Sequence, residues 1–370
     1  MTTAQDHHFM GRAMQLARSS LYSPHPNPRV GCVITQQSEI IGEGWHAYPG
    51  GPHAEVDALG KASRSARGAT AYVTLEPCSH HGRTPPCVDA LLDAGIARVV
   101  VAMQDPNPLV SGRGIQRLID AGVEVSVGVL AGEAEKLNRG FIKRMRHGRP
   151  YVRAKLAMSL DGRTAMSSGE SQWITGTTAR VDVQRLRASS SAILSGIGTV
   201  LADDPSLTVR AKESNLEIAP AQIGQPLRVV VDSRLRMSPS AKLLQQAGDT
   251  LIFSSHHHAE KIAELNAAGA EVVVLDGEQP ALDAVLEALA AREINEVLVE
   301  AGSTLNGALL AQGLIDEIVI YMAPCLMGDG AKGLFHLPEL HAMVDKVVLE
   351  ISDIRAVGND WRISANVVYT

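Results

Sequence analysis

The sequence is poor in cysteine, has no long apolar run and carries no excess of basic residues. Four cysteines in 370 residues do not suggest a disulfide framework and fit a reducing compartment with metal chemistry better. No stretch of 18 apolar residues occurs, which predicts no transmembrane helix. The first residues include Thr, Gln, Asp and two His, in place of the basic patch and apolar region of a secretory signal. We therefore expect a cytoplasmic protein with no membrane partner.

The charge balance argues against a further class of partner. A net charge of -6 at pH 7 and a pI near 6.1 provide no electrostatic attraction for a nucleic-acid backbone. No long run of Lys or Arg compensates locally. We therefore expect no nucleic-acid substrate or partner.

The most informative pattern joins His53-Ala54-Glu55 to Pro77-Cys78 and Pro86-Cys87. One imidazole and two thiols are ligands that zinc prefers, and three protein ligands leave a fourth position for a water whose pKa the metal lowers. In zinc-dependent nucleobase deaminases, the glutamate two residues after the histidine is no ligand but shuttles the proton from that water to the departing amine. The sequence therefore predicts a catalytic zinc site with ligands His53, Cys78 and Cys87, and Glu55 as proton shuttle.

A structural metal, or no metal, is the alternative. A His-x-Glu alone occurs often by chance. A structural zinc site normally closes with four protein ligands, often as two Cys-x-x-Cys pairs, whereas only three candidates occur here. We expect the other cysteines, Cys32 in the apolar run 30–34 and Cys325 beside Pro324, to be small buried hydrophobic residues.

Helical and strand patterns alternate through the first part of the chain. Asp6 is a candidate N-cap for a helix with apolar residues at helical spacing from Phe9 to Ala17. Such alternation implies a sheet with helices on both faces. His53 and Cys87 then begin two helices whose dipoles favour thiolate and hydroxide. Strands are expected over residues 30–35, 40–44, 71–75 and 97–103, and further helices over 53–62 and 87–94.

A chain of this length favours two domains. The basic segment 144–150 ends in Gly-Arg-Pro and is a candidate linker, so we expect domains over residues 1–148 and 149–370. Alternation resumes after the linker and predicts a second α/β domain. Its strands are expected over residues 152–157, 192–195, 227–231, 250–253, 271–275, 296–300 and 318–322.

A nicotinamide dinucleotide is the first cofactor to consider for the second domain, but the Rossmann G-x-G-x-x-G fingerprint is missing. Residues 299–307 instead run from a strand through a small-residue turn into a helix, whose first amides could cradle a pyrophosphate; a glycine needed only for a tight connection is the alternative. Polar clusters at 159–173 and 199–210 follow strands, where ligands of open α/β sheets bind. Arg187 and Arg210 are candidates for a phosphate clamp, with surface arginines as the alternative.

Longer motifs extend these observations over nearly the whole chain. The first half carries His25-Pro-Asn-Pro28, Gly44-Trp-His46, Pro52-His-Ala-Glu-Val56, Thr74 through Cys87, and Asp105-Pro-Asn-Pro108. The second half carries Lys155-Leu, Ser159 through Thr164, Gly169 through Thr175, Leu201 through Pro205, and Glu300-Ala-Gly302. With these motifs the chain resembles the bifunctional riboflavin-biosynthesis deaminase/reductase family. Cytidine, APOBEC-type and tRNA adenosine deaminases close the zinc site with Pro-Cys-x-x-Cys, a shorter cysteine gap than the eight residues found here.

The resemblance implies an N-terminal cytidine-deaminase-like three-layer domain. It implies that zinc is held by His53, Cys78 and Cys87 and that Glu55 moves the proton. The reaction would be hydrolytic removal of the 2-amino group from 2,5-diamino-6-(5-phosphoribosylamino)pyrimidin-4-one. The residues implied to line the substrate pocket are Asn27, His46, Arg83, Asp105 and Asn107.

For the second half the resemblance implies a dihydrofolate-reductase-like domain that pairs into a homo-oligomer. NADPH would deliver a hydride to C1 of the ring-opened ribose and give a ribityl chain. Asp203 and Lys155 are both candidates for the proton donor. The implied substrate contacts are Lys155, Ser171, Arg187, Ser206, Leu207, Arg210 and Glu300. The implied NADPH contacts are Ala157, Trp173, Thr199, Asp203, Ser233, Gly302, Ser303, Thr304, Leu305, Asn306, Gly307 and Ala308.

Two other functions are worth testing against the residues. A nucleoside or tRNA deaminase with an accessory domain would need a basic surface or the short cysteine gap, and the sequence has neither. A regulatory module that keeps zinc for folding and senses NADPH would have no use for Glu55 beside an open metal position. The sequence therefore favours a bifunctional enzyme that acts on a phosphorylated pyrimidine.

Overall fold

A computed structural model of the chain describes residues 3–22, 26–79, 85–108, 110–213 and 224–369. The chain divides into two compact units, Met1–Arg149 and Pro150–Thr370. The linker expected over residues 144–150 is wrong in its first part, through which helix α6 (Arg139–His147) continues. Basic side chains in the last turn of α6 suit the negative end of the helix dipole, and Gly148, with φ of 65°, ends the helix.

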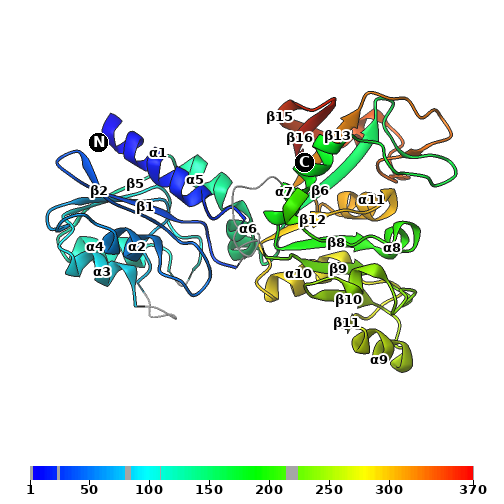
Figure 1. Cartoon of the computed structure of the whole chain (residues 1–370), viewed down its shortest axis with the longest axis horizontal. Coiled ribbons are helices and arrows are strands. Elements are labelled where there is room, and N and C mark those ends of the chain that lie inside the picture. Colours follow the sequence, from blue (N-terminus) through cyan, green and yellow to red (C-terminus); the bar gives the residue numbers. More distant parts are fainter. Residues whose placement is uncertain (1–2, 23–25, 80–84, 109, 214–223, 370) are drawn as a thin grey trace. The chain divides into compact units, whose positions relative to one another are not determined.

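The N-terminal unit is built on a five-stranded sheet with the order β2-β1-β3-β4-β5 (Figure 1). Strand β1 is antiparallel to β2 and β3, whereas β3, β4 and β5 are parallel. Parallel strands end at a common edge, so the loops that follow β3 and β4 lie side by side. The strands are β1 (Gly31–Gln36), β2 (Glu39–Trp45), β3 (Thr70–Val73), β4 (Arg98–Val101) and β5 (Glu124–Val127).

Helices cover both faces of this sheet (Figure 1). Successive strand residues point to opposite faces; Val73 packs with α2, α3 and α4, while its neighbour Tyr72 packs with α1 and α5. The three-layer arrangement confirms the fold class expected for this half of the chain. The helices are α1 (Ala4–Arg18), α2 (Ala54–Gly60), α3 (Cys87–Asp93), α4 (Arg113–Asp120) and α5 (Ala131–Leu137).

Helix α1 is capped by Thr3, so the expected cap at Asp6 is wrong. Thr3 Oγ1 accepts a hydrogen bond from the Asp6 amide at 3.1 Å, and Asp6 Oδ2 accepts one from the Thr3 amide at 2.9 Å. This reciprocal pair is a capping box, in which the acidic residue stands three positions after the cap.

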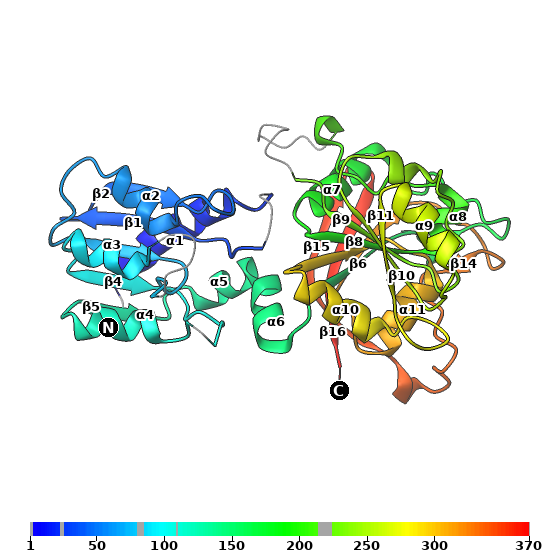
Figure 2. The same cartoon turned by 90° about the horizontal axis from the view of Figure 1, so that it is seen from below.

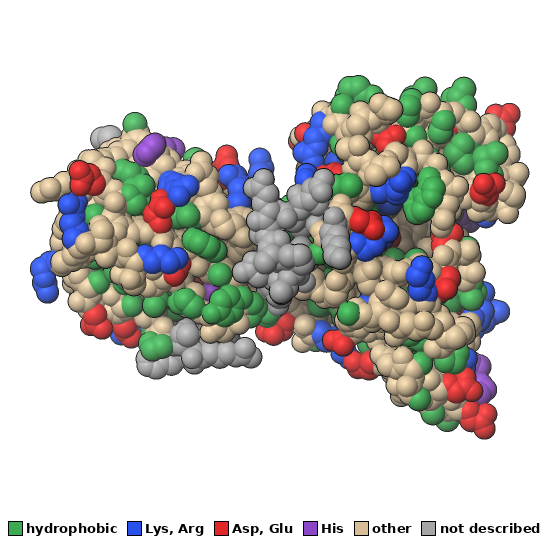
Figure 3. Space-filling model, viewed as in Figure 1, with side chains coloured by type: hydrophobic (Ala, Val, Ile, Leu, Met, Phe, Trp, Pro, Cys, Tyr) green, Lys and Arg blue, Asp and Glu red, His purple; other side chains and the backbone are tan. Residues whose placement is uncertain are grey.

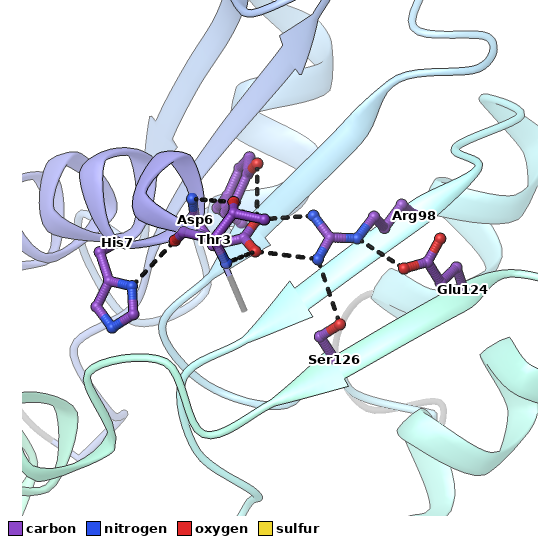
Figure 4. Close-up of polar contacts among 7 residues, drawn as sticks. Thr3, Asp6, His7, Arg98, Glu124 and Ser126 are labelled. Atoms are coloured by element: carbon purple, nitrogen blue, oxygen red, sulfur yellow. Dashed lines mark hydrogen bonds and ion pairs between the residues drawn. The ribbon is translucent and has the colours of Figure 1, made fainter. Parts of the chain in front are cut away.

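Asp6 also joins α1 to the sheet (Figure 4). Its Oδ1 accepts hydrogen bonds from Arg98 Nη1 at 2.7 Å and from the Tyr72 hydroxyl at 3.2 Å. Arg98 in turn contacts Glu124 and Ser126 of β5. The Arg98 guanidinium holds the pKa of Asp6 well below its usual range, and the Asp6 side chain is only 1% exposed. The network therefore links the first helix to two strands through one buried carboxylate.

We expect Asp6→Asn to destabilise the N-terminal unit by about 3 kcal/mol at pH 7, because it leaves a largely buried guanidinium without its carboxylate. The folded-state pKa of Asp6 lies below the unfolded value near ~3.9, so its stabilisation is present at neutral pH and declines below about pH 5. Calorimetry between pH 7 and pH 3 should show a smaller loss on acidification in the variant than in the wild type.

The exposed pair of Arg18 and Glu133 provides the control, since both side chains are 54% exposed. Glu133→Gln should change stability by less than about 0.5 kcal/mol. Equal transition temperatures of Asp6→Asn and the wild type at pH 7 would contradict the assigned role of Asp6.

The C-terminal unit contains a nine-stranded sheet with the order β11-β10-β9-β8-β12-β6-β13-β16-β15 (Figure 2). The first seven strands in this order are parallel, and β16 and β15 continue them as an antiparallel hairpin. The seven parallel strands coincide with the seven expected from the sequence, which did not predict the hairpin. The strands are β6 (Tyr151–Ser159), β8 (Ala192–Gly196), β9 (Leu227–Val231), β10 (Thr250–Ser254), β11 (Ala270–Val274), β12 (Glu296–Val299), β13 (Glu317–Ala323), β15 (Val348–Val357) and β16 (Asp360–Val368).

Helices again cover both faces of the sheet. Val297 and Val299 of β12 pack with α10 and α11, while Leu298 between them packs with α7 on the other face. Helices α8 and α9 share that second face. None of the helices in the described part of the chain has the length and apolar character needed to cross a bilayer. The helices are α7 (Thr177–Ala188), α8 (Ile197–Asp203), α9 (Ala259–Ala267), α10 (Leu282–Ala291) and α11 (Ser303–Ala311).

Candidate active sites

Three side chains of the N-terminal unit bring metal-ligand atoms together. His53 Nδ1 lies 3.1 Å from Cys87 Sγ and 3.5 Å from Cys78 Sγ. With metal–ligand bonds near 2.1 Å to nitrogen and 2.3 Å to sulfur, a tetrahedral zinc ion separates such atoms by roughly 3.6 Å. Within the described residues, no fourth His, Cys, Asp or Glu joins the group. The arrangement therefore fits a zinc ion with three protein ligands.

These ligands lie at the starts of two helices and at the end of one strand. His53 is the N-cap of α2, Cys87 is the first residue of α3, and Cys78 follows β3. Gly44 in β2 lets α2 pack directly on the sheet, since a Cβ there would lie 2.3 Å from the Ala58 backbone nitrogen. The Cys87 amide donates to Cys78 Sγ at 3.3 Å. The convergence of both helix starts on the ligand group confirms the expectation from the sequence.

The two sulfurs share one proton between them. A hydrogen bond from the Cys87 thiol, aided by the His53 ring, lowers the pKa of Cys78 to about 4. The same hydrogen bond, together with burial, raises the pKa of Cys87. Two neighbouring sulfurs that share one proton bind a cation well, because the cation replaces that proton.

Glu55 lies in the first turn of α2 beside this group, and its side chain is 3% exposed. Burial raises the pKa of Glu55 to about 7, and the Cys87 thiol lies close enough to influence it. A carboxyl group that exchanges a proton near neutral pH is suited to general acid–base chemistry. The structure thus places the expected proton shuttle next to the expected ligands.

His46 and Asn27 form a hydrogen-bonded pair close to His53. His46 Nδ1 lies 3.0 Å from the Pro52 carbonyl oxygen, which can only accept, so Nδ1 carries the proton. Asn27 Nδ2 then donates to His46 Nε2 at 2.8 Å. Burial lowers the pKa of His46, which agrees with this neutral form. The rings of His46 and His53 meet edge to face with centroids 5.4 Å apart, so two of the predicted pocket residues do adjoin the metal group.

Sequence reasoning missed Glu76, which organises the loops at the carboxyl edge of the sheet. Its buried carboxylate accepts backbone hydrogen bonds from Asp105 at 3.1 Å, Gly112 at 2.9 Å and Gly114 at 2.9 Å. The Asp105 carboxylate in turn accepts from the Asn107 amide at 2.8 Å. Glu76 therefore fixes the predicted pocket loop and the start of α4 to the strand end that carries Cys78. The motif Thr-Leu-Glu-Pro-Cys could have pointed to it, because its acidic residue is two positions from a ligand.

Gly114 lets α4 pack against this strand end, because a Cβ on it would lie 2.0 Å from the Pro77 carbonyl oxygen. We expect Gly114→Ala to displace the Pro77-Cys78 segment, lower the zinc content of the purified protein and reduce deamination by about tenfold or more. Metal analysis and an ammonia-release assay measure both effects.

Gly132 of α5 is the matched control, since nothing lies within 4 Å of a Cβ placed there. Gly132→Ala should retain zinc and gain up to about 1 kcal/mol of stability. Full zinc occupancy in Gly114→Ala would contradict the steric argument.

Three remaining expectations, two for cysteines and one for the substrate pocket, have different outcomes. Cys32 is buried, as expected. Cys325 is exposed, so its expected burial is wrong; it lies in the loop after β13 between exposed Pro324 and Leu326. Arg83, a predicted substrate contact, lies outside the described residues.

The C-terminal unit holds a largely buried charge cluster around Glu300, directly after β12. Arg187 of α7 donates two hydrogen bonds to Glu300, Nε to Oε1 at 2.6 Å and Nη2 to Oε2 at 2.9 Å. Lys155 Nζ of β6 lies 4.0 Å from Glu300 Oε2. Burial acts to raise the pKa of Glu300, but Arg187 and Lys155 outweigh it and hold the pKa at about 2. Burial lowers the pKa of Lys155. The structure thus unites three of the predicted substrate contacts.

The ends of β8 and β12, where α8 and α11 begin, bring predicted NADPH contacts together. Strands β8 and β12 are neighbours, but the chain continues from β8 to β9 on one side and from β12 to β13 on the other. Ligands of open α/β sheets bind at such a switch point. A Cβ on Gly302 would lie 4.0 Å from Thr199 Oγ1, and one on Gly196 would lie 3.4 Å from Leu305 Cδ2. Gly302 is the N-cap of α11, where free amides suit a phosphate.

The predicted NADPH contacts later in α11 have a different environment from those at its start. Asn306 and Gly307 are buried, and a Cβ on Gly307 would lie 2.1 Å from the His336 carbonyl oxygen. Gly307 therefore has no room for a side chain, because the segment around His336 packs directly against it. The accessible start of the helix consists of Gly302, Ser303 and Thr304, which are exposed or half-buried.

The other predicted contacts are dispersed around the carboxyl edge of this sheet. Trp173 is exposed and stacks under the Arg180 guanidinium at 4.6 Å. Arg210 pairs with Glu213 at 3.1 Å and is half exposed. Asp203 ends α8 on the surface, and within the described residues no hydrogen bond or ion pair joins it to Lys155, the other candidate proton donor. The remaining residues are half-buried Ala157, Ser171, Ser206, Ser233 and Ala308, and buried Leu207.

Comparison with known proteins identifies relatives of both units. The family model described as RibD C-terminal domain matches residues 150–363, and the model described as cytidine and deoxycytidylate deaminase zinc-binding region matches residues 3–103. The riboflavin biosynthesis protein RibD of Escherichia coli strain K12 is 51% identical over 362 residues, which cover 96% of this chain and 98% of that protein. The RibD protein of Haemophilus influenzae is 48% identical over 367 residues, covering 98% and 97%.

Solved structures agree over the whole length. RibD of Acinetobacter baumannii superposes with a TM-score of 0.92 at 45% identity and covers 99% of both chains. A diaminohydroxyphosphoribosylaminopyrimidine deaminase/5-amino-6-(5-phosphoribosylamino)uracil reductase of Thermotoga maritima gives a TM-score of 0.88 at 34% identity, covering 98% and 99%. The expected cofactors, zinc and NADPH, agree with a zinc-binding deaminase region and a reductase domain. The chain belongs to the RibD family of riboflavin biosynthesis proteins and combines a zinc-binding deaminase with a reductase.

Proposed function

We propose that residues 1–148 deaminate 2,5-diamino-6-(5-phosphoribosylamino)pyrimidin-4-one. The observation that supports this most directly is buried Glu55 beside the ligand group of His53, Cys78 and Cys87. Zinc, when bound there, supplies Lewis-acid activation of water. Glu55 holds the proton that leaves the water and delivers it to the departing amino group. Asn27, neutral His46, Arg83, Asp105 and Asn107 are assigned to substrate binding.

Residues 149–370 are assigned the reduction of the deaminated product. NADPH, when bound, supplies the hydride. Thr199 and the start of α11 hold its phosphates, while Lys155, Arg187 and Glu300 orient the ribosyl phosphate chain. The bidentate pair of Arg187 and Glu300 supports this assignment, because it keeps a charged group rigid at the carboxyl edge of the sheet. The proton that accompanies the hydride comes from Lys155 or Asp203.

An assay with the diaminopyrimidinone phosphate tests both assignments. Ammonia release is followed without NADPH, and NADPH oxidation is followed after the first reaction has run to completion. The proposal expects both signals in that order. Ammonia release from cytidine or from tRNA instead would favour a nucleoside or tRNA deaminase, and the absence of both signals with the phosphorylated pyrimidine would overturn the proposal.

We further propose that the protein is cytoplasmic and forms a homo-oligomer through β15. A reducing compartment keeps Cys78 and Cys87 available as metal ligands. Strand β15 is one of the two edge strands of the nine-stranded sheet, and nearly all of its residues are exposed. Val348, Leu349, Ile351 and Ile354 are among them, and hydrophobic side chains are visible at the surface of this unit in Figure 3. An exposed apolar edge strand is suited to pairing with a second copy.

We expect the double substitution Ile351→Lys with Ile354→Lys to shift the wild-type dimer to a monomer in analytical ultracentrifugation. Charged side chains on an edge strand oppose pairing. Ile40→Lys, at an exposed position of β2, is the control and should leave the mass unchanged. A monomeric wild type, or a dimer in the double variant, would refute the role of β15.

A further inference from the structure

Two glutamines hold the backbone of the loop that follows α8. This loop, residues 204–210, lies outside helices and strands. Gln184 of α7 accepts a hydrogen bond from the Arg210 amide at its Oε1, at 2.9 Å. Gln225 forms a reciprocal pair with Val209: its Oε1 accepts from the Val209 amide and its Nε2 donates to the Val209 carbonyl oxygen, both at 2.9 Å. The end of the 204–210 loop is therefore fixed by side-chain amides.

These hydrogen bonds lie in the interior of the C-terminal unit. Gln184 is 2% exposed, and residues 207–209 are buried as well. A buried backbone amide without a partner is costly, so a loop can enter the interior only where other groups complete its hydrogen bonds. A glutamine side chain offers both a donor and an acceptor, so Gln225 pairs with Val209 as a neighbouring strand would. The two glutamines thus hold the loop in one conformation.

The 204–210 loop carries three of the substrate contacts expected from the sequence. Ser206 and Leu207 precede the residues that the glutamines hold, and Arg210 is the last of those residues. Leu207 has φ of 46°, a left-handed conformation that is uncommon for residues other than glycine, so the chain turns at this point. Fixing the backbone after this turn also fixes the direction in which the Arg210 side chain leaves the loop.

The guanidinium groups of Arg187 and Arg210 differ in their partners. Arg187 donates two hydrogen bonds to Glu300 and a third, at 2.9 Å, to the Thr208 carbonyl oxygen. Arg210 pairs with Glu213 at 3.1 Å, and their side chains are 48% and 53% exposed. Because an exposed ion pair contributes little to stability, a phosphate can displace Glu213 from Arg210. Arg210 can then bind that phosphate through two parallel hydrogen bonds, whereas Arg187 is already committed.

The charge of Arg210 also reaches the cluster around Glu300. Burial acts to raise the pKa of Glu300, and Arg210 is one of the cations, after Arg187 and Lys155, that outweigh it and hold the pKa at about 2. A phosphate on Arg210 would therefore lie beside the residues that are proposed to orient the ribosyl chain.

We propose that Gln184 and Gln225 are positioning residues of the reductase, which hold Arg210 where its guanidinium binds the phosphate of the deaminated substrate. This inference deepens the proposed reductase function of residues 149–370 and rests on it. The glutamines act on the substrate only through the backbone of the 204–210 loop. Their loss should therefore impair recognition of the phosphate and leave hydride transfer intact.

Titration calorimetry of the full-length protein tests this role without turnover. The two ligands are the deaminated substrate and its dephosphorylated counterpart, of which the wild type should bind the phosphorylated form more tightly. Gln184→Leu and Gln225→Leu should each weaken the phosphorylated form by about tenfold and leave the other unchanged. Gln245→Leu is the matched control, since Gln245 is exposed and donates to the Ser240 carbonyl oxygen at 3.2 Å; it should change neither ligand.

Steady-state kinetics distinguish positioning from a general loss of structure. Both leucine variants should raise the KM for the deaminated substrate by about tenfold, while kcat and the KM for NADPH stay within about twofold of the wild type. Ammonia release, which is assigned to the N-terminal unit, should be unchanged in every variant.

Replacement by glutamate should affect the two positions differently. Gln184→Glu keeps an oxygen that accepts from the Arg210 amide, so its affinity for the phosphorylated form should stay within about threefold of the wild type. Gln225→Glu keeps the acceptor for the Val209 amide but places an oxygen against the Val209 carbonyl oxygen. It should therefore bind as weakly as Gln225→Leu.

The outcomes separate this inference from the function on which it rests. Equal weakening of both ligands in the leucine variants, or no weakening, refutes the positioning role even if NADPH is oxidised normally. A wild type that binds both ligands equally also refutes it. Selective loss of the phosphorylated form in a protein that reduces no pyrimidine upholds the role and refutes the reductase assignment. If thermal unfolding shows that a leucine variant does not fold, the glutamate variants decide, since equal affinities of Gln184→Glu and Gln225→Glu contradict the proposal.

Discussion

Glu55→Gln is expected to abolish deamination and to leave reduction of supplied intermediate near normal. Glutamine keeps the shape of the side chain but cannot take up and release the proton, and loss of general acid–base catalysis lowers rates by about 10²- to 10⁴-fold. Because burial raises the pKa of Glu55 to about 7, the folded protein already tolerates an uncharged group at this position. The substitution should therefore have little effect on stability.

Three measurements are needed for Glu55→Gln: ammonia release from the diaminopyrimidinone phosphate, NADPH oxidation with deaminated substrate, and metal content. Zinc should remain stoichiometric, since Glu55 is not one of the three ligands. Glu39→Gln, which changes an exposed glutamate of the same unit, should leave both activities intact. Loss of both activities in folded, zinc-loaded Glu55→Gln would contradict two independent sites.

Glu300→Gln is expected to have the opposite effect to Glu55→Gln: reduction is lost and deamination is retained. The carboxylate neutralises Arg187, which is bonded to both of its oxygens, and it also lies near Lys155. Removing its charge leaves two largely buried cations together, which should destabilise the C-terminal unit by about 3–5 kcal/mol. Reduction should fall by more than about 10²-fold, because the arginine and lysine lose their fixed positions.

A double variant separates stability from function at this site. Arg187→Met combined with Glu300→Leu removes both charges of the pair and should recover much of the stability lost in the single variant. It should still not reduce the substrate. Calorimetry of the C-terminal transition and NADPH oxidation give the two readouts. Normal reduction by the double variant would show that the ion pair is purely structural.

The metal ligands could be predicted because zinc-binding combinations of residue types are rare in sequences. Few combinations of residues bind zinc, and the helix starts at His53 and Cys87 follow from local patterns. Glu76 could not be predicted in the same way, because its partners are backbone amides of the loop after β4 and the start of α4, 29 or more positions away. Backbone partners leave no signature in side-chain identity, so the motif around Cys78 could point to Glu76 as a residue of interest but not to the loops that it holds.

In the C-terminal unit, the parallel strands were predictable and the final hairpin was not. Buried parallel strands are continuous apolar runs, such as residues 227–231, and these stand out from their surroundings. Strand β15 is exposed on both faces, and its apolar and polar residues follow no strict alternation that would mark a buried side. The start of α1 was placed three residues late because both partners of a capping box, Thr3 and Asp6, are residue types that cap helices.

The hydrogen bonds of Glu76 have a practical consequence for redesign. One carboxylate ties the loop of Asp105 and Asn107 to the strand end that carries Cys78. A designer who reshapes that loop to admit a different heterocycle will strain a zinc thiolate at the same time, so altered selectivity and weakened metal retention should appear together. Libraries aimed at new substrates are better built around Asn27 and His46, whose mutual hydrogen bond does not involve Glu76.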